Sequence, residues 1–108
     1  MSALDEDAID SIGVETASGK VLLTIADHLD WADENGHVLA LQKKLDAYLA
    51  FVASGELNEV YPDSLGRKPV IDIVGQFPMP MAGRSFLAKV RPIAASVGIE
   101  VRNHVLEQ

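Results

Sequence analysis

The pattern that decides the fold lies in residues 20–54, KVLLTIADHLDWADENGHVLALQKKLDAYLAFVAS. Over residues 20–26 the side chains alternate between two sides of an extended chain, which predicts a strand with one buried side. From about residue 37 to residue 54 the apolar side chains recur three, four and seven positions apart, which is the period of a helix with one buried face. We expect Asp33 or Asn35 to cap the start of this helix. The stretch therefore predicts a strand, a polar junction and an amphipathic helix.

The same reasoning extends to the remainder of the chain. Four further elements are expected: a strand at residues 8–15, a strand at 70–77, a helix at 82–97 and a strand at 99–105. The side chains expected to face the core are Ile12, Val14, Val21, Leu23, Ile25, Val38, Leu41, Leu45, Tyr48, Leu49, Val52, Ile71, Ile73, Phe77, Phe86, Leu87, Val90, Ile93, Ala94, Val97, Ile99, Val101 and Val105. Pro92 falls inside the second helix and must kink or shorten it, since proline cannot donate a backbone hydrogen bond. The order is ββαβαβ. It predicts an α+β fold, a two-layer sandwich whose four-stranded sheet carries both helices on one face.

Composition predicts an ordinary globular protein. The 108 residues are 48% hydrophobic and 23% charged, so we expect one domain over residues 1–108, with residues 1–7 disordered. The chain has no cysteine, which excludes disulfides and thiolate chemistry and fits a reducing compartment. Its start, Met1 to Asp7, lacks the layout of a secretory signal, and no stretch approaches a transmembrane length of about 20 apolar residues. We therefore expect a cytoplasmic protein that binds no membrane.

Negative charge is concentrated in the first third of the chain. Residues 1–36 hold nine acids and one lysine, a net charge of −8, whereas residues 37–108 hold seven acids and eight bases, a net charge of +1. Phosphate backbones repel such a surface, so we expect no nucleic-acid binding. An acidic edge either steers a basic protein partner or a cation, or keeps a small protein in solution.

The junction before the first helix gathers side chains able to bind a metal ion. They are Asp27, His28, Asp30, Asp33, Glu34 and His37. No two histidines have the i, i+4 spacing that would place both on one helical face, and the loop does not match a calcium-binding loop. Acidic residues next to a helix start also stabilise it by about 0.3–1 kcal/mol each. We therefore expect no metal, and a junction whose carboxylates favour the helix start.

Two groups of residues remain as candidate binding sites, and no cofactor is expected. The first group, at the junction, is Asp27, His28, Asp30, Trp31, Asp33 and His37. Trp31 either seals the end of the core or contacts a partner. The second group is Gly83, Arg84 and Ser85, where free backbone N–H groups at a helix start would suit an anion, although an ordinary helix start explains these residues better. No serine lies in a G-x-S-x-G nucleophile motif, so we expect no catalytic residue.

The first 75 residues contain a distinctive set of segments from Ile9-Asp10 to Tyr61-Pro62, above all Asp27-His28-Leu29-Asp30-Trp31 and Ala47-Tyr48-Leu49-Ala50-Phe51. In these segments the chain resembles a family of small bacterial proteins of unknown function. The family has no established activity, so the resemblance implies a single domain and transfers no catalytic or binding role.

The most probable function from sequence is protein binding. We expect a non-catalytic accessory domain that binds a protein partner or forms a homo-oligomer, because the charge is unevenly divided and one face of the sheet lacks helices. That face is either simply hydrated or a pairing surface, and it should carry Leu22, Thr24, Asp72, Gln76, Arg102 and His104. The alternative is a small-ligand or metal-dependent activity centred on the junction from Asp27 to His37.

Overall fold

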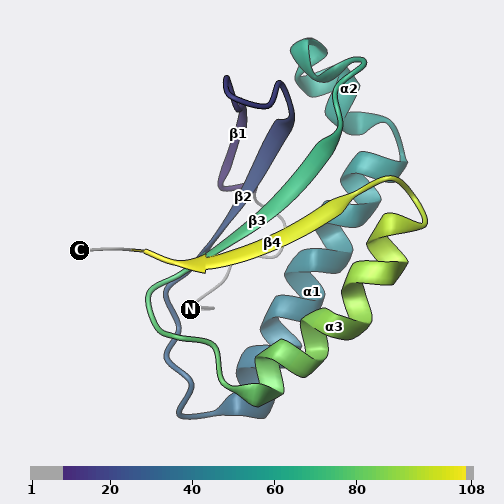
Figure 1. Cartoon of the computed structure of the whole chain (residues 1–108). Coiled ribbons are helices and arrows are strands. Elements are labelled where there is room, and N and C mark those ends of the chain that lie inside the picture. The colour runs from purple at the N-terminus through teal and green to yellow at the C-terminus, as the bar shows by residue number, and fades with distance from the viewer. Residues whose placement is uncertain (1–8, 107–108) are drawn as a thin grey trace.

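A computed structural model of the chain describes residues 9–106 and shows a four-stranded sheet with helices against one face (Figure 1). The strands are β1 (Ser11–Val14), β2 (Val21–Asp27), β3 (Pro69–Gly75) and β4 (Glu100–Val105). The helices are α1 (Glu34–Ala53), the short α2 (Glu56–Val60) and α3 (Met81–Ala95), with a 3₁₀ turn at Pro62–Ser64. None of these helices is long and apolar enough to cross a bilayer. The prediction for residues 1–7 lies outside the described residues.

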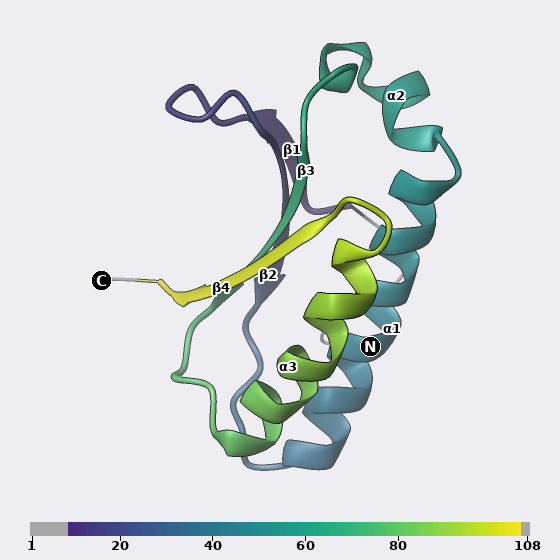
Figure 2. The ribbon, with the colours of Figure 1, turned by 45° about the vertical axis from the view of Figure 1, so that its right-hand side comes forward.

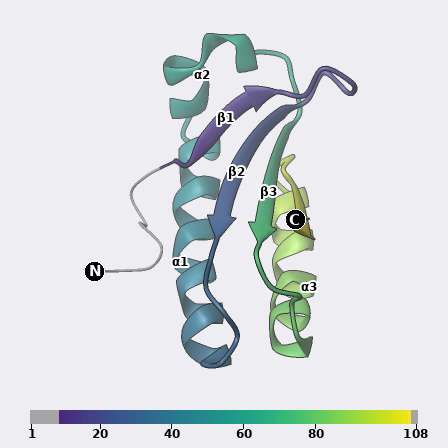
Figure 3. The ribbon, with the colours of Figure 1, turned by 90° about the vertical axis from the view of Figure 1, so that its left-hand side faces the viewer.

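The sheet has the order β1-β2-β3-β4, and the connections explain its strand directions. β1 runs antiparallel to β2 because a short turn joins them, whereas β3 runs parallel to β2 (Figure 3). β4 in turn runs parallel to β3 (Figure 1). α1 returns the chain from the end of β2 to the start of β3, and α3 does the same between β3 and β4. Both helices lie side by side on the same face (Figure 2). The predicted α+β sandwich is confirmed.

The core fills the space between the helices and the sheet. The sheet contributes alternate side chains of β2 and β3, and α1 and α3 each contribute one stripe of side chains. The members that are at most 1% exposed are Val21, Leu23, Ile25, Ile71, Ile73, Leu41, Leu45, Tyr48, Leu87 and Ala94. The sequence predicted most of these positions. Two-residue and 3.6-residue periods are therefore sufficient to identify the residues that meet in the centre of this sandwich.

Four side chains predicted to be buried are instead exposed. Phe77 is 43% exposed because β3 ends at Gly75, so Phe77 falls in the following loop. Ile93 is 63% exposed, since the buried stripe of α3 consists of Gly83, Leu87 and Ala94 and turns away from it. Val97 follows the end of α3, and Val105 lies where β4 extends away from both helices (Figures 1 and 2). α3 ends at Ala95, two residues earlier than predicted and one turn after Pro92.

The start of α1 is also earlier than predicted. The helix begins at Glu34, and Asp33 is its cap, with Oδ1 accepting the backbone N–H of Gly36 at 3.0 Å. Asn35, the other candidate, lies inside the first turn. The apolar period could not reveal these residues because the first turn of α1 is polar and exposed. At the other end Gly55, with φ of 89°, takes the left-handed conformation that ends a helix.

Tyr48 connects α1 to the sheet through its phenol group. The hydroxyl donates to the carbonyl of Thr24 at 2.7 Å and accepts the backbone N–H of Asp10 at 3.0 Å. The side chain is fully buried, and this burial raises the pKa of Tyr48 to about 12. The phenol thus joins α1, β2 and the segment before β1 in one place.

We expect Tyr48→Phe to lower the free energy of unfolding by about 1–3 kcal/mol, because the partly buried carbonyl of Thr24 and the N–H of Asp10 each lose their partner. Between about pH 10 and pH 12 the folded protein keeps the phenol proton that the unfolded chain releases, so the stability of the native protein should fall over this range. Tyr48→Phe should remove this part of the alkaline decline, and Tyr61→Phe should retain it. Urea unfolding at several pH values measures both effects. If the free energy of unfolding fell equally steeply with pH in the two variants, the alkaline decline could not be assigned to the phenol of Tyr48.

Candidate functional site

Three aspartates shape the junction between β2 and α1. Asp27 is the last residue of β2, and its Oδ1 accepts the backbone N–H of Leu29 at 3.2 Å. Asp30 accepts the N–H of Ala32 at 3.0 Å in the same manner, and Asp33 caps α1. Each short carboxylate holds a backbone turn two or three residues ahead. The acidic character of this loop is therefore explained first by its backbone geometry.

Asp27 and His37 form a buried pair at the centre of the junction. Nε2 of His37 lies 2.6 Å from Oδ2 of Asp27, and the two residues are only 3% and 4% exposed, respectively. Nδ1 of His37 lies 2.9 Å from the carbonyl oxygen of Asp30. A carbonyl oxygen can only accept, so Nδ1 carries a hydrogen and donates it. The short contact at Nε2 then requires a second proton between the ring and the carboxylate. The pair is electrically neutral as a whole, which suits its burial.

Trp31 covers this pair and reaches α3. Its indole stacks on the His37 ring with centroids 3.6 Å apart and an angle of 19° between the planes. The far edge of the indole lies against α3 at Gly83, where an added Cβ would be 2.7 Å from Cη2 of Trp31 and would also overlap Met79. Trp31 is partly buried and packs against the core. Of the two roles open from sequence, the position of Trp31 matches the one in which it seals the end of the core.

The junction offers little room for a ligand. A cavity of about 20 Å³ lies beside Asp27, Trp31 and Met79, which is the size of one water molecule. Both ring nitrogens of His37 are already engaged, so a metal ion could bind there only by displacing a hydrogen bond. In residues 9–106 no group of three or more histidine, aspartate and glutamate side chains is placed to hold a metal ion. His28 is exposed. The structure thus brings Asp27, Trp31 and His37 together.

The three residues of the predicted anion site have separate surroundings. Gly83 is buried against Trp31, whereas Arg84 and Ser85 are exposed. Nε of Arg84 donates to the carbonyl of Met79 at 3.0 Å, within the loop before the helix. The helix start at Pro80 has no side-chain cap. Close packing explains why glycine stands at position 83, and anion binding here stays a prediction.

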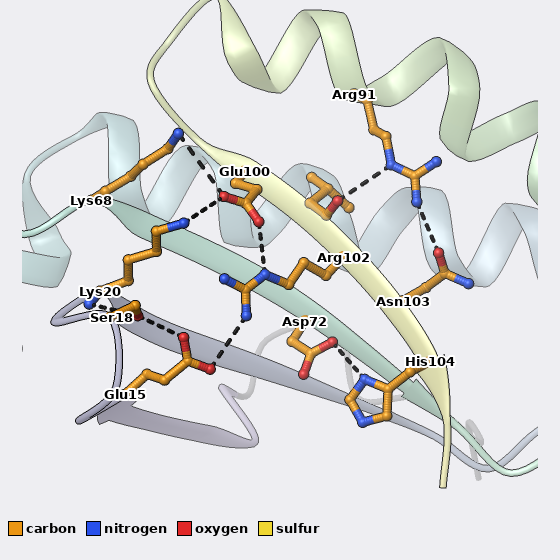
Figure 4. Close-up of polar contacts among 11 residues, drawn as sticks. Glu15, Ser18, Lys20, Lys68, Asp72, Arg91, Glu100, Arg102, Asn103 and His104 are labelled. Carbon is orange, nitrogen blue, oxygen red and sulfur yellow. Dashed lines mark hydrogen bonds and ion pairs between the residues drawn. The ribbon is translucent and has the colours of Figure 1, made fainter.

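Charged side chains cover the face of the sheet that lacks helices (Figure 4). Arg102 on β4 contacts Glu100 at 2.7 Å and reaches across the sheet to Glu15 at 3.3 Å. Lys20 contacts the other oxygen of Glu100 at 3.1 Å. Hydrogen bonds from Ser18 and Arg102 lower the pKa of Glu15, and those from Arg102 and Lys20 lower the pKa of Glu100. These residues form the ion-pair array, which connects the turn after β1 to β4.

The array shields the centre of this sheet face. Val70 on β3 is in register with Glu100, and it is fully buried although no helix covers it. Asp72 is 6% exposed and contacts Nδ1 of His104 at 3.1 Å. Of the residues predicted on this face, Gln76 falls beyond β3. The face therefore consists largely of charges that already have partners within the chain.

Sequence reasoning missed a buried lysine in α1. Lys44 is fully buried, lies 3.7 Å from a carboxylate oxygen of Asp10 and places its ammonium 5.5 Å from the centre of the Tyr48 ring. Its position could have been found, because residues 37, 41, 44, 45 and 48 follow one helical stripe. The partner, Asp10, also accepts the N–H of Ala26. Much of the acidic excess of the first third is thus used inside the fold.

The outer surface of the helical layer carries an apolar groove between α1 and α3. The groove encloses about 290 Å³ and is lined by Gln42, Leu45, Asp46 and Leu49 of α1 and by Phe86, Lys89, Val90 and Ile93 of α3. We call these eight residues the helical groove. Ile93 is 63% exposed at its margin, and Asp46 and Lys89 are exposed on opposite helices. The patterns in the sequence placed Ile93 in the core, so this surface was not anticipated.

Comparison with known proteins gives one match. The model of a family described as "Family of unknown function (DUF6572)" matches residues 1–107. No curated protein and no solved structure matches the chain.

Proposed function

Since the chain belongs to DUF6572, a family of unknown function, we propose a role from its own geometry: it is a non-catalytic accessory domain that binds protein through the helical groove. The single observation that carries this proposal is the apolar groove, with Ile93 63% exposed beside it. Exposed apolar surface between helices is a common docking place for another protein. The proposed setting is a bacterial cytoplasm.

The sheet face and the junction give less support for a binding site than the helical groove does. The sheet face is covered by the ion-pair array, whose charges are matched within the chain. The carboxyl ends of parallel strands often hold substrates, yet the cavity at this edge has the volume of about one water molecule, and the polar atoms of Asp27 and His37 are engaged with one another. These observations favour binding over catalysis. They also reduce the support for a ligand or metal activity at the junction.

Site-specific photocrosslinking tests the proposal. A photoreactive amino acid placed at Ile93 in cells that produce the protein should give a covalent adduct with a protein. The matched control is Val60 on α2, which is 66% exposed, nearly the same as Ile93, but does not line the groove. We expect the adduct from position 93 only. No adduct, or equal adducts from both positions, would sink the proposal.

A further inference from the structure

The two sides of the helical groove carry opposite charges. Asp46 stands on the α1 side and Lys89 on the α3 side, and within residues 9–106 neither takes part in an ion pair. Asp46 and Lys89 are the charged residues among the eight that line the groove. The groove therefore has a negative charge on its α1 side and a positive charge on its α3 side. A partner that matches it must carry the reverse arrangement.

The shape of the helical groove also has two complementary parts. Leu49, Phe86 and Val90 line a hollow, and Ile93 is exposed at its margin. A two-fold axis brings the same patch of two molecules together, so that residue i of one contacts residue j of the other and j contacts i. A patch with both a hollow and a projecting side chain, and with both charge signs, can complement itself under such an axis.

We propose that the occupant of the helical groove is a second copy of this chain, which deepens the proposed function and rests on it. The two copies pack helical layer against helical layer, with α1 of one over α3 of the other. Ile93 of each copy enters the hollow of its partner. Asp46 of each copy meets Lys89 of the other, so one pair of residues makes two equivalent ionic contacts. The contacts are at the rim and set the orientation more than the affinity.

The edge of the sheet at β4 is less suited to joining two copies. Arg91 of α3 donates from Nε to the carbonyl of Val101 at 3.3 Å and from Nη2 to Oδ1 of Asn103 at 2.8 Å. The guanidinium thus occupies part of the outer edge of β4. A charged side chain over an edge strand hinders the addition of another strand. The helical layer is then the better surface for self-association.

Charge exchange tests this dimer directly. Sedimentation equilibrium of the purified full chain, from low micromolar to near-millimolar concentration, should give a dimer. Asp46→Lys or Lys89→Asp alone brings like charges together twice and should weaken association roughly tenfold or more. The double exchange, Asp46→Lys with Lys89→Asp, should restore most of the affinity. Ile93→Asp should give a monomer, and Val60→Asp, at a site of matching exposure outside the groove, should remain a dimer.

The outcomes separate the two proposals. All four positions of the test lie on the surface, and unchanged circular dichroism and melting temperature establish that each variant is folded. A chain that stays monomeric at every concentration overturns the dimer, as do two single charge variants that associate like the native protein. If the photoreactive residue at position 93 joins a protein of different mass while the chain is monomeric, the dimer fails and protein binding stands. A monomer without any adduct removes both.

Discussion

His37→Ala will lower the free energy of unfolding by about 3–5 kcal/mol, because it leaves the buried carboxyl group of Asp27 without the partner that neutralises it. The substitution also removes the ring on which Trp31 stacks and leaves the carbonyl of Asp30 without its donor. A domain of this size is stable by about 5–15 kcal/mol, so the loss is a large share of the total. Urea unfolding followed by the fluorescence of Trp31, the single tryptophan, measures it.

Asp27→Asn is the matched control for this prediction. The amide has the shape of the carboxyl group, can donate to Nε2 of a neutral His37 and can still accept the N–H of Leu29. We expect it to cost about 1 kcal/mol, far less than His37→Ala. In the double variant Asp27→Asn/His37→Ala, the alanine no longer leaves a buried charge without a partner. The losses of stability in the two single variants should therefore not add up in the double variant. Two outcomes would show that Asp27 and His37 are not a coupled pair: additive losses of unfolding free energy in the double variant, or a smaller loss in His37→Ala than in Asp27→Asn.

The same experiment addresses a ligand role for the junction. A structural pair predicts that zinc leaves the unfolding midpoint of the native protein unchanged, because the ring nitrogens of His37 are occupied. A rise in the midpoint with zinc that is absent in His37→Ala would instead favour the metal-dependent alternative.

Gly83→Val will destabilise the protein by about 2–3 kcal/mol through overpacking. A Cβ at this position would lie 2.7 Å from Cη2 of Trp31, and valine adds two methyl groups in the same place. Met79 is flexible and can move, but Trp31 is held by its stack on His37. We therefore expect the indole to shift and the emission of Trp31 to change along with the melting temperature.

Gly13→Val is the control for this substitution. It introduces the same side chain, but nothing lies within 4 Å of a Cβ at this position in β1. Valine also favours strands, so the expected change is small. Met79→Ala combined with Gly83→Ala should recover part of the stability lost in Gly83→Ala alone, since it clears one of the two overlapping neighbours. A Gly83→Val protein as stable as Gly13→Val would refute the packing of Trp31 on α3.

Sequence period predicted the elements and their order, but the details depended on contacts between distant segments. Val21, Leu23 and Ile25 were placed correctly because a strand has only two sides. Leu87 and Ala94 of α3 were also placed correctly, whereas Ile93 was misplaced because the buried stripe of this helix includes Gly83 and turns away from position 93. A glycine carries little hydropathy, so a pattern based on large apolar side chains does not reveal the centre of the buried face.

In the candidate site, too, the sequence predicted the local feature but not the contacts between residues far apart in the chain. The capping role of Asp33 follows from its position before a helix, and it was predicted. The pairing of Asp27 with His37 was not, although both were named, because their separation along the chain gives no fixed distance across a loop. The buried position of Lys44 contradicts its usual preference for solvent. Its ion pair with Asp10 explains the exception and depends on how the segment before β1 lies against α1.

The contact of Trp31 with Gly83 has a consequence for how the protein assembles. Trp31 belongs to the segment that joins β2 to α1, and Gly83 belongs to the helix that joins β3 to β4. The two strand–helix–strand units share β3, and the indole reaches its native place only when α1 and α3 both lie on the sheet. The native emission of the single tryptophan is therefore expected to report the joint placement of both helices rather than the formation of either one alone.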